Sequence, residues 1–307
     1  MRKTIIPMFL LVLLNLSITA QKINILSNEQ VLLPTSEMGY FPIMSPNSDF
    51  ILITSGDFKG IAKYDLNTKQ FNMLSQEQGA GFGYQISNDG KHVVYRSQEY
   101  INRLRYMNLK SLDLTTGKET EIIQRTRNLE GFTVKEGTVL AVDNGKTISK
   151  QLSGQHIDAS TAVASIRQGQ LKVTRNNQLT TSSPQGEDLG YLWASVSPDG
   201  TKLLYYVIEH GKAYVSNIDG SNPVSLGVLR APKWVGNEWV AGMVDFDNGH
   251  VVTSSKIVMV GANGKIRTDL TSPDVIALNP SGSADASKIV YNTADGKVFL
   301  MNIEILK

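Results

Sequence analysis

One short turn motif recurs along the chain at nearly even spacing. Ser45 to Ser87 is 42 residues, and Ser197 to Asn279 is 82 residues, about twice that step. Each copy follows a short apolar run and precedes a run rich in β-forming residues. The copies are Ser197-Pro198-Asp199-Gly200, which is the strongest, and the weaker Ser45-Pro46-Asn47-Ser48, Ser87-Asn88-Asp89-Gly90 and Asn279-Pro280-Ser281-Gly282. A period of roughly 40 residues, with one four-stranded unit in each, indicates a β-propeller.

The rest of the chain also has an all-β pattern, because short strands alternate with turn residues and helical periodicity is nearly absent. Five segments repeat the same order of strands and turns: residues 41–74, 83–123, 192–227, 233–270 and 275–303. The last segment lacks an outer strand. Residues 30–33 or 23–26 are expected to supply that strand and close the ring, which removes an exposed sheet edge.

The number of blades depends on residues 128–190, where no copy of the motif survives. The step from Ser87 to Ser197 is 110 residues, which is neither two nor three regular steps. Two hairpins are visible there, around Asn144-Gly145 and Gln168-Gly169. Counting each hairpin as a blade gives seven blades, and allowing one enlarged blade gives six. We predict an all-β propeller with six or seven four-stranded blades and favour seven.

The N-terminus has the features of a secretory signal peptide. Arg2 and Lys3 precede an apolar run over residues 5–16, and small residues then lead to Ala20. The run is shorter than the ~20 residues that a membrane-spanning helix needs. We therefore predict a signal peptide over residues 1–20, a single propeller domain over 21–307, and export to the periplasm or the extracellular space, with no membrane span after cleavage.

Net charge narrows the classes of partner, and cysteine content bears on how the fold is stabilised. Removal of residues 1–20 takes away Arg2 and Lys3, which leaves 28 basic against 28 acidic residues. A formally neutral chain lacks the basic footprint of a nucleic-acid-binding protein, so no nucleic-acid partner is expected. The chain contains no cysteine, so packing and hydrogen bonds must stabilise the exported fold without disulfides. The oligomeric state is left open.

The Ser-Pro-Asp-Gly turn between an apolar strand and a β-rich strand resembles the WD40-like Pro-Asp repeat of TolB-type propellers. Similar propellers form the N-terminal domains of prolyl oligopeptidases and dipeptidyl peptidases. The resemblance covers most of residues 40–303 and concerns a turn and a blade rather than a chemical site. It implies a stand-alone secreted propeller with a binding or scaffold role.

The sequence contains no motif of a known catalytic centre. Gly-x-Ser-x-Gly, a Walker-type loop and His-Glu-x-x-His are all missing, and the four histidines are dispersed. His210 and His250 fall at equivalent hairpin tips of neighbouring units and are candidate metal ligands, with exposed turn histidines as the alternative. Asp245 and Asp247 open a segment that resembles a Ca²⁺ loop, with an ordinary hairpin turn as the alternative. No other cofactor is expected.

Two further groups of residues are candidates for ligand binding at the mouth of the axial channel. Aromatic side chains at the starts of inner strands offer large contact areas for a sugar ring or a peptide. Arginines near connections on the same face are able to hold a carboxylate or phosphate, or instead to pair with Glu99, Glu119 or Glu121. The candidates are Tyr40, Phe82, Tyr191 and Trp193, and Arg103, Arg105, Arg125 and Arg127. Trp193 has packing between blades as its alternative role, Trp234 is expected in that core, and Tyr191 fits the core and the mouth equally well.

These features favour an exported, non-catalytic binding or scaffold propeller that recognises a peptide, a protein partner or a glycan on the axial-channel face. The alternative is a propeller-type lyase or hydrolase acting on a polysaccharide or peptide, with a site assembled from scattered loops and a metal ion as its optional component. An oligomeric structural module is a third hypothesis.

Overall fold

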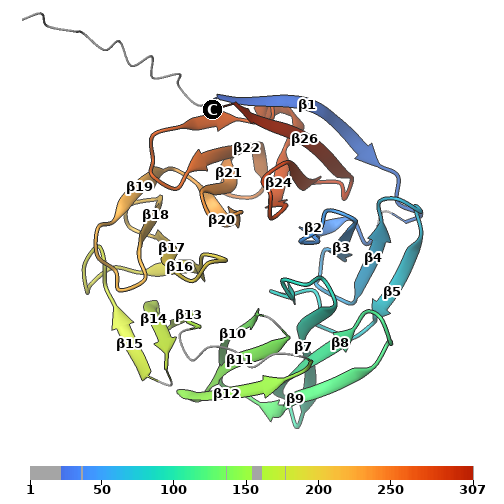
Figure 1. The fold of residues 1–307 in the computed structure, drawn as a ribbon, viewed down its shortest axis with the longest axis vertical. Coiled ribbons are helices and arrows are strands. Elements are labelled where there is room, and N and C mark those ends of the chain that lie inside the picture. The colour runs from blue at the N-terminus through green and yellow to red at the C-terminus, as the bar shows by residue number, and fades with distance from the viewer. Residues whose placement is uncertain (1–21, 36, 136, 154–160, 177, 307) are drawn as a thin grey trace, which may run out of the picture.

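The computed structural model describes residues 22–35, 37–135, 137–153, 161–176 and 178–306. Seven antiparallel sheets surround a central axis in this part of the chain (Figure 1), which confirms the predicted all-β propeller and the favoured count of seven blades. Five of the sheets have four strands. The other two have three strands among the described residues, whereas the sequence predicted four in every blade.

The first four blades follow in chain order, each from its inner strand outward. Blade 1 contains β2 (Tyr40–Met44), β3 (Phe50–Thr54), β4 (Ile61–Asp65) and β5 (Phe71–Ser75). Blade 2 contains β6 (Gln85–Ile86), β7 (His92–Ile101), β8 (Leu104–Asp113) and β9 (Glu119–Thr126). Blade 3 contains β10 (Leu129–Lys135), β11 (Thr138–Asp143) and β12 (Lys146–Gln151). Blade 4 contains β13 (Val163–Arg167), β14 (Gln170–Arg175) and β15 (Gln178–Ser182).

The last three blades each have four strands. Blade 5 contains β16 (Tyr191–Val196), β17 (Lys202–Val207), β18 (Lys212–Asn217) and β19 (Val224–Gly227). Blade 6 contains β20 (Arg230–Val235), β21 (Trp239–Asp247), β22 (Val252–Gly261) and β23 (Arg267–Asp269). A short 3₁₀ helix, η1 (Pro273–Val275), leads to blade 7. Blade 7 contains β24 (Ala277–Gly282), β25 (Lys288–Thr293), β26 (Val298–Leu306) and β1 (Lys22–Val31).

The strand register defines the two faces of the disc. The start of β2 pairs with the end of β3, and the start of β16 pairs with the end of β17. We call the face where the inner strands begin the mouth face. In the four-stranded blades, this face therefore carries the connections between second and third strands and the connections between blades. The turns between first and second strands lie on the opposite face, which we call the turn face.

A buried serine explains the recurring turn motif on the turn face. The Ser197 hydroxyl donates to Asp199 Oδ1 (2.6 Å) and accepts from the Lys202 backbone N–H (2.9 Å). Ser87 and Ser283 make the same pair of hydrogen bonds in blades 2 and 7. In blade 1, the Ser45 hydroxyl donates to Asp49 and accepts from the Phe50 N–H.

The copy predicted at Asn279-Pro280-Ser281-Gly282 is wrong. These residues lie inside β24, and the turn that follows is Ser283-Ala284-Asp285-Ala286. Because Asn279 has a φ of 52° and the register of β24 shifts between Leu278 and Ser281, this segment is a β-bulge rather than a turn.

The ring closes as predicted, by pairing of the N-terminal strand with the last blade. β1 is the outer strand of blade 7 and pairs antiparallel with β26 from Lys22↔Leu306 to Val31↔Val298. Ile23 of this strand is buried against Ile289 and Met301 of the same blade. Figure 1 shows β1 along the rim beside β26.

Blade 4 departs from the regular pattern because its inner strand runs in the reverse direction. Arg167 at the end of β13 forms an ion pair with Glu130 at the start of β10 (3.3 Å). The opposite ends, Lys135 of β10 and Val163 of β13, line the same part of the axial cavity. The irregular spacing between residues 87 and 197 thus reflects two three-stranded blades, one of them inverted.

Packing between neighbouring blades forms the core. The second strand β3 is buried along its whole length, and Ile51 and Ile53 pack with Val290 and Val298 of blade 7. The only helix among the described residues is η1, so no helix there has the length and apolar character needed to cross a membrane.

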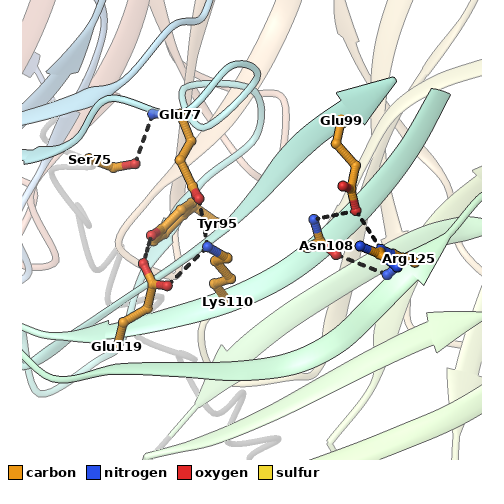
Figure 2. A network of polar contacts seen from close by, with 8 residues as sticks. All are labelled: Ser75, Glu77, Tyr95, Glu99, Asn108, Lys110, Glu119 and Arg125. Carbon is orange, nitrogen blue, oxygen red and sulfur yellow. Dashed lines mark hydrogen bonds and ion pairs between the residues drawn. The ribbon is translucent and has the colours of Figure 1, made fainter. Parts of the chain in front are cut away.

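A charged network adds to the contact between blades 1 and 2. Lys110 Nζ lies 2.6 Å from Glu77 and 2.9 Å from Glu119, and Glu119 also accepts a hydrogen bond from the Tyr95 hydroxyl (Figure 2). Burial acts to lower the pKa of Lys110, but the hydrogen bonds and charges of the two glutamates outweigh it and raise the pKa. The network therefore keeps Lys110 protonated.

Candidate binding site

A cavity of about 570 Å³ lies on the axis of the disc. All seven inner strands contribute to its lining, from Ile43 on β2 to Ser281 on β24. Its volume is within the range of ligand-binding pockets, roughly 300–1,000 Å³. The channel is thus large enough to hold a small ligand or an inserted side chain.

Bulges near the starts of the inner strands give the channel mouth an unusual backbone. In four blades the register shifts within the inner strand, and a residue with positive φ lies at each shift. These residues are Phe41 (47°), Trp193 (49°), Ala231 (45°) and Asn279 (52°). A large aromatic residue in this conformation is a rare outlier, and such strain of about 1–3 kcal/mol is concentrated at functional sites. The mouth is therefore a candidate site on backbone geometry alone.

Aromatic rings form an arc along blades 1 to 3 at the mouth. The Phe41 and Phe58 ring centroids lie 4.4 Å apart, and those of Phe58 and Phe82 lie 5.3 Å apart. The Arg96 guanidinium continues the arc, 5.3 Å from the Phe82 ring and 5.5 Å from the Phe132 ring. Burial, together with the nearby Arg105, lowers the pKa of Arg96 to about 10, so it stays charged at neutral pH.

Exposed apolar side chains are concentrated on the mouth face. Of the sixteen exposed large hydrophobic residues in the described part of the chain, eleven lie in or beside the connections of this face. The other five lie on β-strands, and none is in a turn of the opposite face. The eleven are Leu32, Phe82, Tyr100, Leu104, Leu192, Trp193, Ile208, Val228, Phe246, Val251 and Val275. Such an asymmetry is typical of a surface that contacts a partner.

The structure places the four predicted aromatic residues in different surroundings. Phe82 is 48% exposed and Trp193 is 38% exposed, with the Trp193 ring packed edge-on against Tyr206 (4.9 Å). Tyr40 is half-buried, and its ring lies over Gly56. Phe82 and Trp193 are therefore available to a ligand at the mouth.

For Tyr191 the sequence left the core and the channel mouth open, and the structure places it in the core between blades 4 and 5, where it is only 1% exposed. Its hydroxyl donates to the Gly186 carbonyl and accepts from the Gln185 N–H, so both of its polar functions are satisfied inside the protein. Tyr191 is not available at the channel mouth.

The four predicted arginines do not reach the axial cavity. Arg125 is held by Glu99 through its Nε (3.2 Å), and its backbone N–H donates to Asn108 (2.9 Å; Figure 2). Arg103, Arg105 and Arg127 are exposed on the mouth face of blade 2 and its connection to blade 3, and none of the four lines the cavity. A role in binding an anion on the outer surface stays a prediction.

The residues considered for a metal site are engaged in other contacts. Asp245 Oδ2 lies 3.1 Å from Arg230, and Asp247 accepts the Gly249 N–H of its own hairpin turn. His210 Nδ1 lies 2.9 Å from the Tyr214 hydroxyl, while His250 is exposed on the neighbouring blade. Within the described ranges, no three His, Asp or Glu side chains are gathered around a common point that a metal ion would occupy. The geometry therefore gives no support to Ca²⁺ or another metal at these residues.

Several residues of the site were not identified from the sequence. Phe41 and Phe58 belong to the mouth, and Lys233 lines the cavity from β20. A lysine between apolar residues in a predicted inner strand was the available signal for Lys233. Trp234, expected in the core, packs partly against the core of blades 5 and 6 and also lines the cavity.

Comparisons with known proteins support the fold. The sequence matches no protein-family model, and a search of curated proteins gives no match. Among solved structures, a streptogramin B lyase is similar over 91% of this chain and 98% of its own, with a TM-score of 0.62 and 11% identity. A putative TolB from Agrobacterium tumefaciens is similar over 87% of this chain and 90% of its own (TM-score 0.53, 13% identity).

TolB from Acinetobacter baumannii is similar over 78% of this chain, with a TM-score of 0.52 and 16% identity, and the matched region spans 56% of that protein. The expected resemblance to TolB-type propellers therefore holds at the level of the fold. Because neighbours at such low identity include a lyase as well as TolB proteins, the fold leaves the function open.

Proposed function

We propose that this protein is an exported binding propeller that recognises a peptide segment of a protein partner on its mouth face. The observation that carries the proposal is the concentration of exposed apolar residues on this face, around an aromatic arc with a strained backbone. Aromatic anchors such as Phe82 and Trp193 supply large contact area while few rotatable bonds become ordered. Export follows from the predicted signal peptide over residues 1–20, which lies outside the described residues.

A peptide fits this surface better than a glycan does. The mouth combines apolar side chains with the charged Arg96, which suits alternating apolar and acidic side chains of an extended peptide. A carbohydrate site would instead need several convergent hydrogen-bonding side chains among the aromatic rings. Eleven exposed large apolar side chains lie on this face, which favours the apolar contacts of a peptide.

Selection from a random peptide library displayed on phage tests the proposal. Peptides enriched on the wild-type protein are expected to bind Phe82→Ala and Trp193→Ala at least about tenfold more weakly, because each change removes an anchor. Leu26→Ala and Leu179→Ala remove exposed apolar residues from strands outside the mouth and serve as matched controls.

Peptides that bind all four variants equally would contradict a mouth-face site. Turnover of a polysaccharide or peptide by the pure protein, lost on mutation of cavity residues, would instead support the lyase or hydrolase alternative.

A further inference from the structure

The axial cavity has a charge imbalance that the mouth-face proposal does not use. Its charged lining residues are the basic Lys135, Arg175 and Lys233 and the acidic Asp199. Asp199 Oδ1 already accepts hydrogen bonds from the Ser197 hydroxyl and from the N–H and hydroxyl of Thr201. Apart from Arg175, which has an interaction of its own, the described lining therefore offers the basic Lys135 and Lys233, and its carboxylate serves the adjacent turn.

Lys233 is the most unusual member of this lining. It lies on inner strand β20 and forms no hydrogen bond or ion pair with any residue that the structure describes. Burial lowers its pKa from 10.5 to about 8. A charged amine without a partner in a desolvated position is unfavourable for folding, so its presence in a closed ring of inner strands needs an explanation.

Neutral groups of the cavity wall are also left unsatisfied. Trp234 Nε1 and Thr161 Oγ1 belong to lining residues, are shielded from solvent, and have no hydrogen-bond partner among the described residues. These two atoms have almost no accessible surface, so they do not face the open cavity, and Lys233 is the donor that can meet a ligand there.

We infer that the axial cavity binds a small organic anion, with the Lys233 ammonium as its main contact to a carboxylate or phosphate group. The ammonium offers three donors as a compact charge, and Lys135 extends the positive field along the same cavity. The enclosed position strengthens the attraction relative to that of an exposed lysine. Lys233 and Lys135 lie in the later halves of β20 and β10, toward the turn face, so the inference does not rest on the proposed function.

Chemical protection of Lys233 provides a direct test in the full-length mature protein. Acetylation by an amine-reactive ester is followed by mass spectrometry near pH 8, where Lys233 is partly neutral. Citrate represents a carboxylate ligand, inorganic phosphate a phosphate ligand, and glycerol a neutral control. We expect citrate or phosphate to slow acetylation of Lys233 by about tenfold at saturation, with little effect on the exposed Lys212.

Calorimetry with the same probes measures which anion binds and whether Lys233 holds it. Lys233→Gln is expected to weaken binding of the effective anion by at least about tenfold, whereas Lys233→Arg, which keeps the charge, and the surface control Lys212→Gln retain most of it. Protection by citrate alone assigns a carboxylate ligand, and protection by phosphate alone assigns a phosphate ligand.

Two results would overturn the inference: an acetylation rate at Lys233 that neither anion changes, or equal losses of binding in Lys233→Gln and Lys212→Gln. Peptide binding at the mouth face should be unaffected by Lys233→Gln, so failure of one proposal is distinguishable from failure of the other.

Discussion

At the residue scale, Lys233 illustrates a conflict between binding and stability. A methionine of similar length would fill the same space in the channel wall without a charge to desolvate. The fold keeps the amine nevertheless, in a cavity whose described lining also includes the basic Lys135 and Arg175 and the acidic Asp199. The unfavourable charge therefore predicts a measurable penalty on folding.

Replacement of Lys233 by Met should stabilise the protein at neutral pH by on the order of 1–3 kcal/mol. The folded-state pKa of about 8 lies below the ordinary 10.5, so the unfolded state binds more protons between these values. The penalty is fully present below about pH 8 and fades as the pH rises toward 10.5, so the gain should shrink over that window. Urea unfolding of both proteins at about pH 7 and about pH 10 checks this prediction.

The exposed variant Lys212→Met should change stability by less than about 0.5 kcal/mol at either pH. A gain for Lys233→Met that is the same at both pH values would mean that packing, rather than charge, limits stability at this position.

Side-chain direction explains why some site residues could not be predicted. The sequence located the start of β16, but alternate residues of a strand point to opposite sides, and the bulge at Trp193 shifts that alternation. Tyr191 therefore enters the core, whereas Trp193 stays at the mouth. Lys233 was missed for the same reason, because a sequence pattern alone does not say which inner-strand residues face the axis.

At the scale of the element, the turns were the most predictable part of the molecule. Their chemistry is local: the hydroxyl of Ser197 accepts the N–H five residues later and donates to the intervening Asp199. The Asn279-Pro280 pair was misread because proline marks bulges as well as turns. Pro42, Pro232 and Pro280 each follow a positive-φ residue in an inner-strand bulge, a signal that the turn-based interpretation overlooked.

The motif serine should contribute to stability in proportion to its burial. Ser197→Ala leaves the Lys202 N–H without its hydroxyl acceptor and Asp199 without one donor, so we expect a loss of about 1–2 kcal/mol. Ser221 makes a similar contact with Asp219 in an exposed turn, and Ser221→Ala should cost less than about 0.5 kcal/mol. Chemical unfolding measures both, and equal losses would show that burial is not what makes the motif serine important.

At the scale of the whole molecule, the regular repeat predicted the propeller, the count of hairpins favoured seven blades, and the missing outer strand of the last segment predicted the closure. The sequence did not predict the reversed β13 or the two three-stranded blades. A missing strand and a reversed strand both alter the spacing between motif copies, and a single sequence does not tell these two causes apart. The structure thus corrects the assumption of seven equivalent units.

Closure of the ring should be essential for stability. Ile23→Asp places a carboxylate in the core of blade 7 and should lower the free energy of unfolding by about 3–5 kcal/mol. Ile25, on the same strand, is 45% exposed, so Ile25→Asp should have an effect of less than about 1 kcal/mol.

Thermal unfolding and light scattering would check the pair, because loss of β1 exposes the edge of β26 and should promote association. Two variants with equal stability would indicate that blade 7 holds together without β1.

The pairing of Lys22 with Leu306 also determines how the molecule yields to mechanical load. Both ends of the described chain emerge at the same end of one antiparallel ladder. A pull on the two termini therefore breaks the hydrogen bonds of this ladder one at a time. A pull between two points on other blades would have to shear whole strands past one another. Tethered by its ends, the disc should therefore open from the seam between β1 and β26 at low force.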